Sequence, residues 1–283
     1  MNNKFLGIIA VLLVVVIGWY WATGTTTTIA FEEINLEELS MGHYEGWAVF
    51  GDEKVSIGTF NANDELSFTS KRDLASADKI VVTIEPEGDT DDIPSDIVVL
   101  SGDMVDGVAE LSFPVDLRNS TGGYILATPS DGTFNNETSG VWFLRTPEPL
   151  TASLILPTLP RGWVYEGWVM HKGLPLSSGR FSDVAMADDF NGYSGSFPTP
   201  NFPGEDYLVN APDGIEFPIN IADGSSKIVV SIEPDIDGQD PTGDSPFQVK
   251  PFVGDVFAGA SDHTNYNLVL NLEGLPSGTA MVQ

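Results

Sequence analysis

The pattern of hydrophobic and polar positions predicts a chain built from short β-strands. Runs of roughly four to eight residues rich in Val, Ile, Thr, Phe and Tyr are separated by turns rich in Gly, Pro, Asn and Asp. Beyond the N-terminal segment, no stretch keeps a helical apolar period through three turns, and this favours an all-β fold. Ile80–Ile84 and Ile228–Ile232 are almost continuously β-branched. We therefore expect two central strands, each followed by a proline that cannot continue the ladder.

These two strands belong to a longer internal repeat. The sequence Lys-Ile-Val-Val-Thr-Ile-Glu-Pro at 79–86 recurs at 227–234 with one Thr replaced by Ser. Upstream, Tyr-Glu-Gly-Trp at 44–47 recurs at 165–168, and in both copies a Gly-x-Phe follows the tyrosine at the same distance. Equal spacing fixes the alignment of the two copies. It predicts two tandem β-sandwich-like (Ig-like) domains related by duplication.

The repeat suggests the domain boundaries. Residues 1–30 form an N-terminal anchor and a Thr-rich stalk, 31–147 the first β domain, and 148–283 the second, with the joint in the proline-rich segment 146–149. The second copy carries an inserted loop at about 188–218. Its aromatic residues favour a lid over the core of the same domain, although a binding loop is the alternative. They are Tyr193, Phe197, Phe202, Tyr207 and Phe217.

The N-terminal segment predicts export through a membrane. Phe5–Ala22 is apolar and uncharged, and as a helix it would cover about 27 Å of the roughly 30 Å hydrocarbon core. Lys4 is the only basic residue before it and Lys54 is the next after it, so we expect the N-terminus in the cytoplasm and the rest outside. Trp19–Trp21 suits the outer headgroup zone. The alternative is a secreted protein released by signal cleavage near residues 22–24.

Charge and composition exclude several classes of function. The chain has 41 Asp and Glu against 12 Lys and Arg, a formal net charge of -29, and this acidic excess would repel nucleic acid. There is no cysteine, which excludes disulfides, Cys-ligated metals and a thiol nucleophile. Asn119 and Asn136 begin glycosylation sequons, which matter only in a host that modifies exported asparagines.

An acidic loop follows each Glu-Pro, and the second is a candidate calcium site. Calcium prefers oxygen ligands from flexible acidic loops, and Asp-Ile-Asp-Gly at 235–238 alternates donors before a glycine. The order departs from the EF-hand pattern, so a solvated turn is the competing interpretation. The candidate ligands are Asp235, Asp237, Asp240 and Asp244.

Other candidate chemistry has structural explanations. Two glutamates in each copy could act as acid and base if they lay about 5 to 9 Å apart. We favour a structural role, in which these carboxylates accept hydrogen bonds from backbone or lysine donors at the strand ends. These glutamates are Glu45 and Glu85 in the first copy and Glu166 and Glu233 in the second. Trp47 and Trp168 would dock carbohydrate or peptide if they were exposed, but core positions are expected for such large aromatic residues.

The remaining residues indicate no catalytic or cofactor-binding site. His43, His171 and His263 are not equivalent in the two copies and have no metal-ligand spacing, so we expect surface or turn positions. A Gly-x-Ser-x-Gly elbow, a Walker loop and a Rossmann fingerprint are absent from the sequence. We therefore expect that the protein is not an enzyme.

Leu156–Pro160, followed by Gly162–Trp168 and the later Ile-Glu-Pro strand, resembles the extracytoplasmic C-terminal domain of anti-sigma-K-type factors. The first copy carries the same pattern more loosely. In that family a cytoplasmic helical module holds a sigma factor, one membrane span follows, and the outer β domain has a regulatory or sensing role. Only four residues precede the span here, so the resemblance implies the outer domain without its sigma-binding module.

Together these features predict a single-pass plasma-membrane protein with two β domains outside, acting as a non-enzymatic binding or sensing module with a protein partner at the cell surface. The alternative is a structural component of the cell envelope or of a surface assembly, in which strand edges and the domain joint make contacts.

Overall fold

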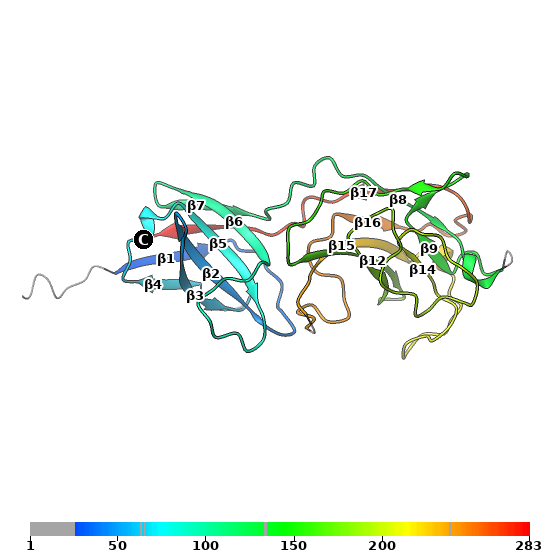
Figure 1. Cartoon of the computed structure of the whole chain (residues 1–283), viewed down its shortest axis with the longest axis horizontal. Helices are drawn as coiled ribbons and strands as arrows, with labels where there is room; N and C mark the ends of the chain where they lie inside the picture. The colour runs from blue at the N-terminus through cyan, green and yellow to red at the C-terminus, as the bar shows by residue number, and fades with distance from the viewer. Residues whose placement is uncertain (1–25, 63, 65, 133–134, 238) are drawn as a thin grey trace, which may run out of the picture.

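The protein is all-β, as the residue pattern predicts. The computed structural model describes residues 26–62, 64, 66–132, 135–237 and 239–283. Strands make up 42% of the chain and helix 4%, and the strands form two large barrel-like sheets (Figure 1). The expected span at Phe5–Ala22 lies outside the described residues. In the part that is described, no helix is long and apolar enough to cross a membrane.

The first sheet, here called the first barrel, contains eight strands in the order β3-β2-β5-β6-β7-β18-β1-β4. Seven of them come from the first part of the chain, and β18 comes from the last described residues. The bounds are β1 Thr27–Glu32, β2 His43–Phe50, β3 Glu53–Phe60, β4 Ser67–Ser70, β5 Lys79–Glu85, β6 Val98–Val105, β7 Val108–Ser112 and β18 Ser277–Val282. Residues 27–30, expected in a stalk, therefore lie in a strand of this sheet.

The second barrel also has eight strands, in the order β13-β12-β15-β16-β17-β8-β9-β14. The bounds are β8 Gly122–Leu126, β9 Gly140–Trp142, β12 Trp163–His171, β13 Leu174–Phe181, β14 Gly204–Asp206, β15 Lys227–Pro234, β16 Phe252–Asp255 and β17 Tyr266–Leu270. Smaller elements are the ribbon of β10 Leu144–Arg145 with β11 Thr151–Ala152, and the 3-10 turns Leu74–Ser76, Pro129–Asp131 and Ile221–Asp223.

The two barrels repeat one pairing scheme. β2, β3, β5 and β6 pair as β12, β13, β15 and β16 do, and β5 and β15 are central strands, as expected from their β-branched sequences. β1 between β18 and β4 corresponds to β9 between β8 and β14. The chain nevertheless enters the second barrel at β8 and returns to the first at β18. The sheets therefore do not divide at the expected joint in 146–149. β8 and β9 precede the joint but belong to the second barrel, and β18 follows it but belongs to the first barrel.

The Tyr-Glu-Gly-Trp motifs form matching hairpins. In both copies the register shifts between the motif's glycine and tryptophan, so the facing strand bulges by one residue. Gly58, on β3 beside the bulge, has φ +148°, and an added Cβ would lie 2.6 Å from the Phe68 ring. Tyr44 stacks on Phe60 with ring centroids 5.7 Å apart, and the second copy reproduces this pair. The Gly-x-Phe motif thus supplies the bulge and the aromatic partner.

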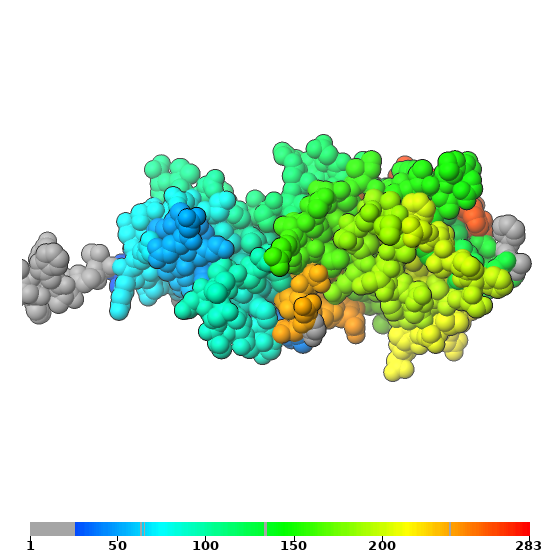
Figure 2. Space-filling view, viewed as in Figure 1, coloured from blue at the N-terminus to red at the C-terminus, as the bar shows by residue number. Residues whose placement is uncertain are grey.

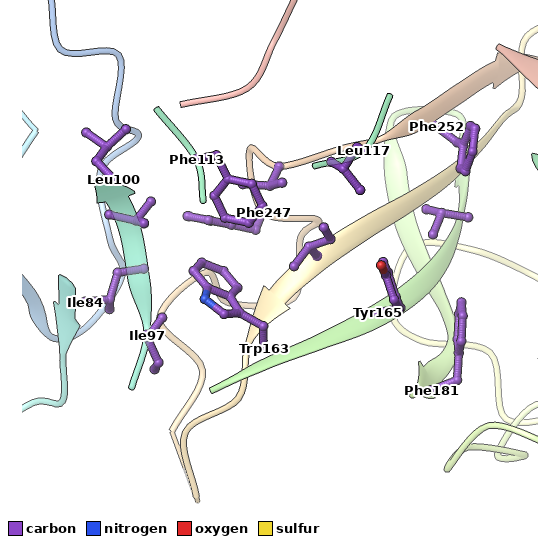
Figure 3. Packing of buried hydrophobic residues seen from close by; sticks show 14 of the residues in the cluster. Ile84, Ile97, Leu100, Phe113, Leu117, Trp163, Tyr165, Phe181, Phe247 and Phe252 are labelled. Carbon is purple, nitrogen blue, oxygen red and sulfur yellow. The ribbon is translucent and has the colours of Figure 1, made fainter. Parts of the chain in front are cut away.

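Apolar side chains join the two barrels. Trp163 meets Phe113 edge to face at 5.4 Å and lies 5.9 Å from the Phe247 ring (Figure 3). Phe113 comes from the connection between β7 and β8, and Leu117 of the same connection is also buried. A single cluster of buried hydrophobic residues therefore extends from one barrel into the other. This continuity makes the joint a packed interface.

Candidate functional site

A network of buried polar side chains lies along one face of β12 and β15. The Trp168 indole N–H donates to Ser231 Oγ at 2.8 Å, and the Ser231 hydroxyl donates to Glu233. Glu233 also accepts the backbone N–H of Phe247 at 2.9 Å. Alternation along the strands puts these residues on one face, because Ser231 and Glu233 are two residues apart. The face is buried rather than open to solvent.

The first barrel contains the same network. Trp47 donates to Thr83 Oγ1 at 2.8 Å, and the Thr83 hydroxyl donates to Glu85. Both carboxylate oxygens of Glu85 accept the backbone N–H of Ser95 at 3.1 Å. Glu85 is only 1% exposed, as is its counterpart Glu233. Donors thus hold these carboxylates at the strand ends, which is the structural arrangement that we favoured from the sequence.

The two networks differ in one charge. Arg180 Nε donates to Glu166 Oε2 at 3.0 Å, and Ser177 donates to the other oxygen. Burial raises the pKa of Glu166, while Ser177 and Arg180 oppose this shift. Burial also raises the pKa of Glu233, to about 7. Thr59 pairs with Glu45 in the register where Arg180 pairs with Glu166, so the first barrel has no arginine at this place.

Both tryptophans of the repeated motif are core residues. Trp47 is 1% exposed and Trp168 is 4% exposed. Docking of a carbohydrate or peptide on exposed rings is therefore contradicted, and the core interpretation is confirmed. Their indole N–H groups are satisfied within the network, which explains why a large polar aromatic residue is tolerated there.

The candidate calcium loop lies at the joint between the barrels, where Figure 2 shows it in orange. Ser40 donates to the carbonyls of Asp240 and Pro241, and the Asp240 carboxylate accepts from Thr242 N and Oγ1. In the described chain, which omits residue 238, no group of three or more His, Asp or Glu side chains is placed to hold a metal. The structure thus does not bring Asp235, Asp237, Asp240 and Asp244 together as a ligand set.

The three histidines lie apart. His171 is buried, so the expected surface or turn position is wrong for this residue, and burial lowers its pKa. Its Nδ1 lies 2.8 Å from Ser226 Oγ and 3.5 Å from Asp223 Oδ2. A Ser-His-Asp relay needs the serine and the carboxylate on opposite ring nitrogens, whereas both contact Nδ1 here. The trio therefore ties the end of β12 to the turn after residue 221.

A groove lies beside this trio, at the end of the second barrel away from the joint. It has a volume of about 930 Å³. Leu174, Ile215 and Phe217 supply its apolar surface. The polar and charged lining residues are His171, Lys172, Glu216, Asn220 and Asp223. We call it the distal groove. Sequence reasoning missed it because its walls, the β12–β13 turn and residues 214–223, are far apart in the chain.

The inserted loop covers part of the second barrel. Tyr207 is fully buried and lies 5.9 Å from the Tyr193 ring, which in turn meets Phe217 at 5.2 Å. Phe202 is also packed against buried residues. The lid interpretation thus holds for these four aromatic residues, whereas Phe197 is 55% exposed.

The lid also brings in three acidic side chains that sequence reasoning missed. Burial raises the pKa of Glu205 to about 7 and that of Asp188 to about 6, and it raises the pKa of Asp206 as well. Each has local donors: Ser194 donates to Glu205, Gly204 N donates to Asp188, and the Trp142 indole donates to Asp206 at 2.8 Å. The Trp142 bond anchors the lid to β9, whereas the other two bonds join β14, which is part of the lid, to residues earlier in the lid.

The comparisons with known proteins add no assignment. No family model, no curated protein and no solved structure matches the chain. The resemblance to the outer domain of anti-sigma-K-type factors therefore stays a prediction. Asn119 and Asn136 are both exposed, so both sequons are sterically accessible.

Proposed function

We propose that this chain is a membrane-anchored extracytoplasmic protein whose second barrel binds a partner at the distal groove, without catalysis. The observation that carries the proposal is the groove itself, whose lining is mixed. Leu174, Ile215 and Phe217 are apolar, whereas the other lining residues include the polar or charged Lys172, Glu216, Asn220 and Asp223. Its volume lies in the range of small-molecule binding sites, and its mixed lining suits a partner that presents both apolar and polar groups. The buried carboxylates Glu85 and Glu233 accept hydrogen bonds from side chains and backbone N–H groups around them, which supports a structural role for these two groups.

The position of the groove fits such a role. β1 begins at Thr27, close in the chain to the proposed span, and the second barrel lies beyond the first along the long axis (Figure 1). An anchor at Phe5–Ala22 would thus present the groove away from the membrane. In this proposal the two barrels are Ig-like units related by duplication, and the likeness to anti-sigma-K-type factors concerns the outer domain alone.

Orientation can be tested with single cysteines, because the natural chain has none. We expect Lys172→Cys to react with a membrane-impermeant maleimide on intact cells. Asn3→Cys should react only after the cells are lysed. Labelling of Lys172→Cys only after lysis would contradict export of the second barrel.

Binding at the groove can be tested separately with a photo-crosslinking residue. Leu174 lies in the distal groove, and Val105, on the first barrel, is the control because it is more exposed. We expect one discrete adduct on living cells from Leu174 and none from Val105. Equal crosslinking at the two positions, or no adduct at either, would count against the groove as the binding site.

A structural role in a surface assembly is the second candidate. It is favoured by the discontinuous first barrel, in which a strand supplied by residues 277–282 completes the sheet. Purified protein that stays monodisperse across a wide concentration range would weaken this alternative.

A further inference from the structure

Strands β8 and β18 occupy corresponding places in the two barrels, and each reaches its place by crossing from the other barrel. β8 follows β7 in sequence but pairs between β17 and β9 of the second barrel. β18 follows β17 but pairs between β7 and β1 of the first barrel. In both cases the strand leaves the set of strands that it follows in the chain and completes the other barrel (Figure 1). The connection before this strand is thus able to pass from one barrel to another.

β18 is held mainly by its backbone ladder. It is hydrogen-bonded on both sides, in register from Ser277 opposite Ser112 to Val282 opposite Ile29. Among its side chains only Ala280 is buried. Few apolar contacts are therefore lost when the strand leaves, and every one of them is restored when an identical strand enters.

The place in the first barrel selects the β18 sequence. Ala280 lies opposite Ala109, and both are fully buried, whereas the equivalent pair in the second barrel is Tyr124 opposite Tyr266. A tyrosine entering beside Ala109 would overpack the first barrel. The place also requires a glycine, because a Cβ added at Gly278 would lie 2.8 Å from Ile34 Cγ1. β8 has Gly122 in the equivalent register, so the Ala280 position is what distinguishes the two strands. The best occupant of this place is therefore β18 itself, from the same chain or from a second copy.

We propose that β18 is exchanged between copies of this chain, so that residues 277–282 of one molecule complete the first barrel of another. The connection 271–276 is the hinge. All strand pairings are the same in the closed and the exchanged forms, so the balance between them depends on chain concentration against the effective concentration of the tethered strand. This inference goes beyond the proposed binding function and does not depend on it.

Cysteine trapping tests the exchange in the full chain, solubilised in mild detergent. Glu32 on β1 faces Thr279 on β18, and directly paired strand residues lie within disulfide range. Glu32→Cys and Thr279→Cys are made in separate chains, which are mixed at high concentration and mildly oxidised. We expect covalent dimers, several-fold above a control mixture of Asp52→Cys with Thr279→Cys, with a yield that rises with protein concentration.

The double variant Glu32→Cys/Thr279→Cys calibrates the result. At low concentration it should close an internal disulfide, which shows that the two strands pair as described. An internal disulfide in the double variant, with mixed dimers no more abundant than in the control, would overturn the proposal. Failure of the double variant to close internally would overturn it as well, because the exchanged contact itself would then be absent.

Discussion

Arg180, opposite Glu166 in the second barrel, corresponds to Thr59, opposite Glu45 in the first. Replacing Arg180 with threonine therefore removes the one charge by which the two buried polar networks differ. Arg180 Nε lies 3.0 Å from Glu166 Oε2, and the two side chains are 27% and 7% exposed. Removing one partner of a buried ion pair typically costs about 3 to 5 kcal/mol. Because the guanidinium is partly solvated, we expect Arg180→Thr to lower the free energy of unfolding by about 2 to 3 kcal/mol at pH 7.

The loss should depend on pH in a defined direction. Burial raises the pKa of Glu166, and Arg180 opposes that shift, so Arg180→Thr should raise this pKa further. When a carboxyl group has a higher pKa in the folded state than in the unfolded state, the protein loses stability as the pH rises from the unfolded-state pKa through the folded-state pKa. The variant should thus approach the wild type near pH 4 and fall behind it towards pH 8.

Urea denaturation followed by circular dichroism at several pH values measures this difference. The matched variant is Thr59→Arg, which places a guanidinium opposite Glu45 in the first barrel. We expect it to be neutral or stabilising, because burial also raises the pKa of Glu45. A loss below about 0.5 kcal/mol for Arg180→Thr, the range of ordinary surface substitutions, or a loss independent of pH, would refute the argument.

Three further predictions concern the core and the joint. Glu233→Gln should leave stability below about pH 4 almost unchanged and raise it at pH 8 by up to about 3 kcal/mol, because the folded pKa of about 7 exceeds the unfolded value of 4.5. Parallel pH curves for variant and wild type would contradict this. Tyr124→Ala should cost about 3 kcal/mol in urea denaturation, since the ring is buried 5.3 Å from Tyr266, whereas Tyr124→Phe should cost much less. Calorimetry should find one cooperative transition for both barrels, because the first barrel needs β18 and one apolar cluster runs through the joint; two separated transitions would show that the barrels unfold independently.

Local patterns in the sequence were sufficient for the fold class and for the repeat. The β-branched runs at 80–84 and 228–232 predicted the central strands β5 and β15. Equal spacing of the Tyr-Glu-Gly-Trp and Gly-x-Phe motifs aligned the two copies, and the structure shows that both motifs lie in matching hairpins. These features depend on residues close in the chain, so their physical consequences can be read from the order of the side chains.

Only the tertiary structure decided which barrel β8 and β18 join and which surfaces are exposed to solvent. The sequences of β8 and β18 have little in common, because each fits different neighbours: Ala280 packs opposite Ala109, and Tyr124 opposite Tyr266. No local motif therefore reveals that β8 and β18 cross between the barrels, and the domain boundary inferred from the repeat misses this crossing. The distal groove and the contact of His171 with Ser226 likewise join segments that are distant in the chain, and no local spacing predicts that proximity.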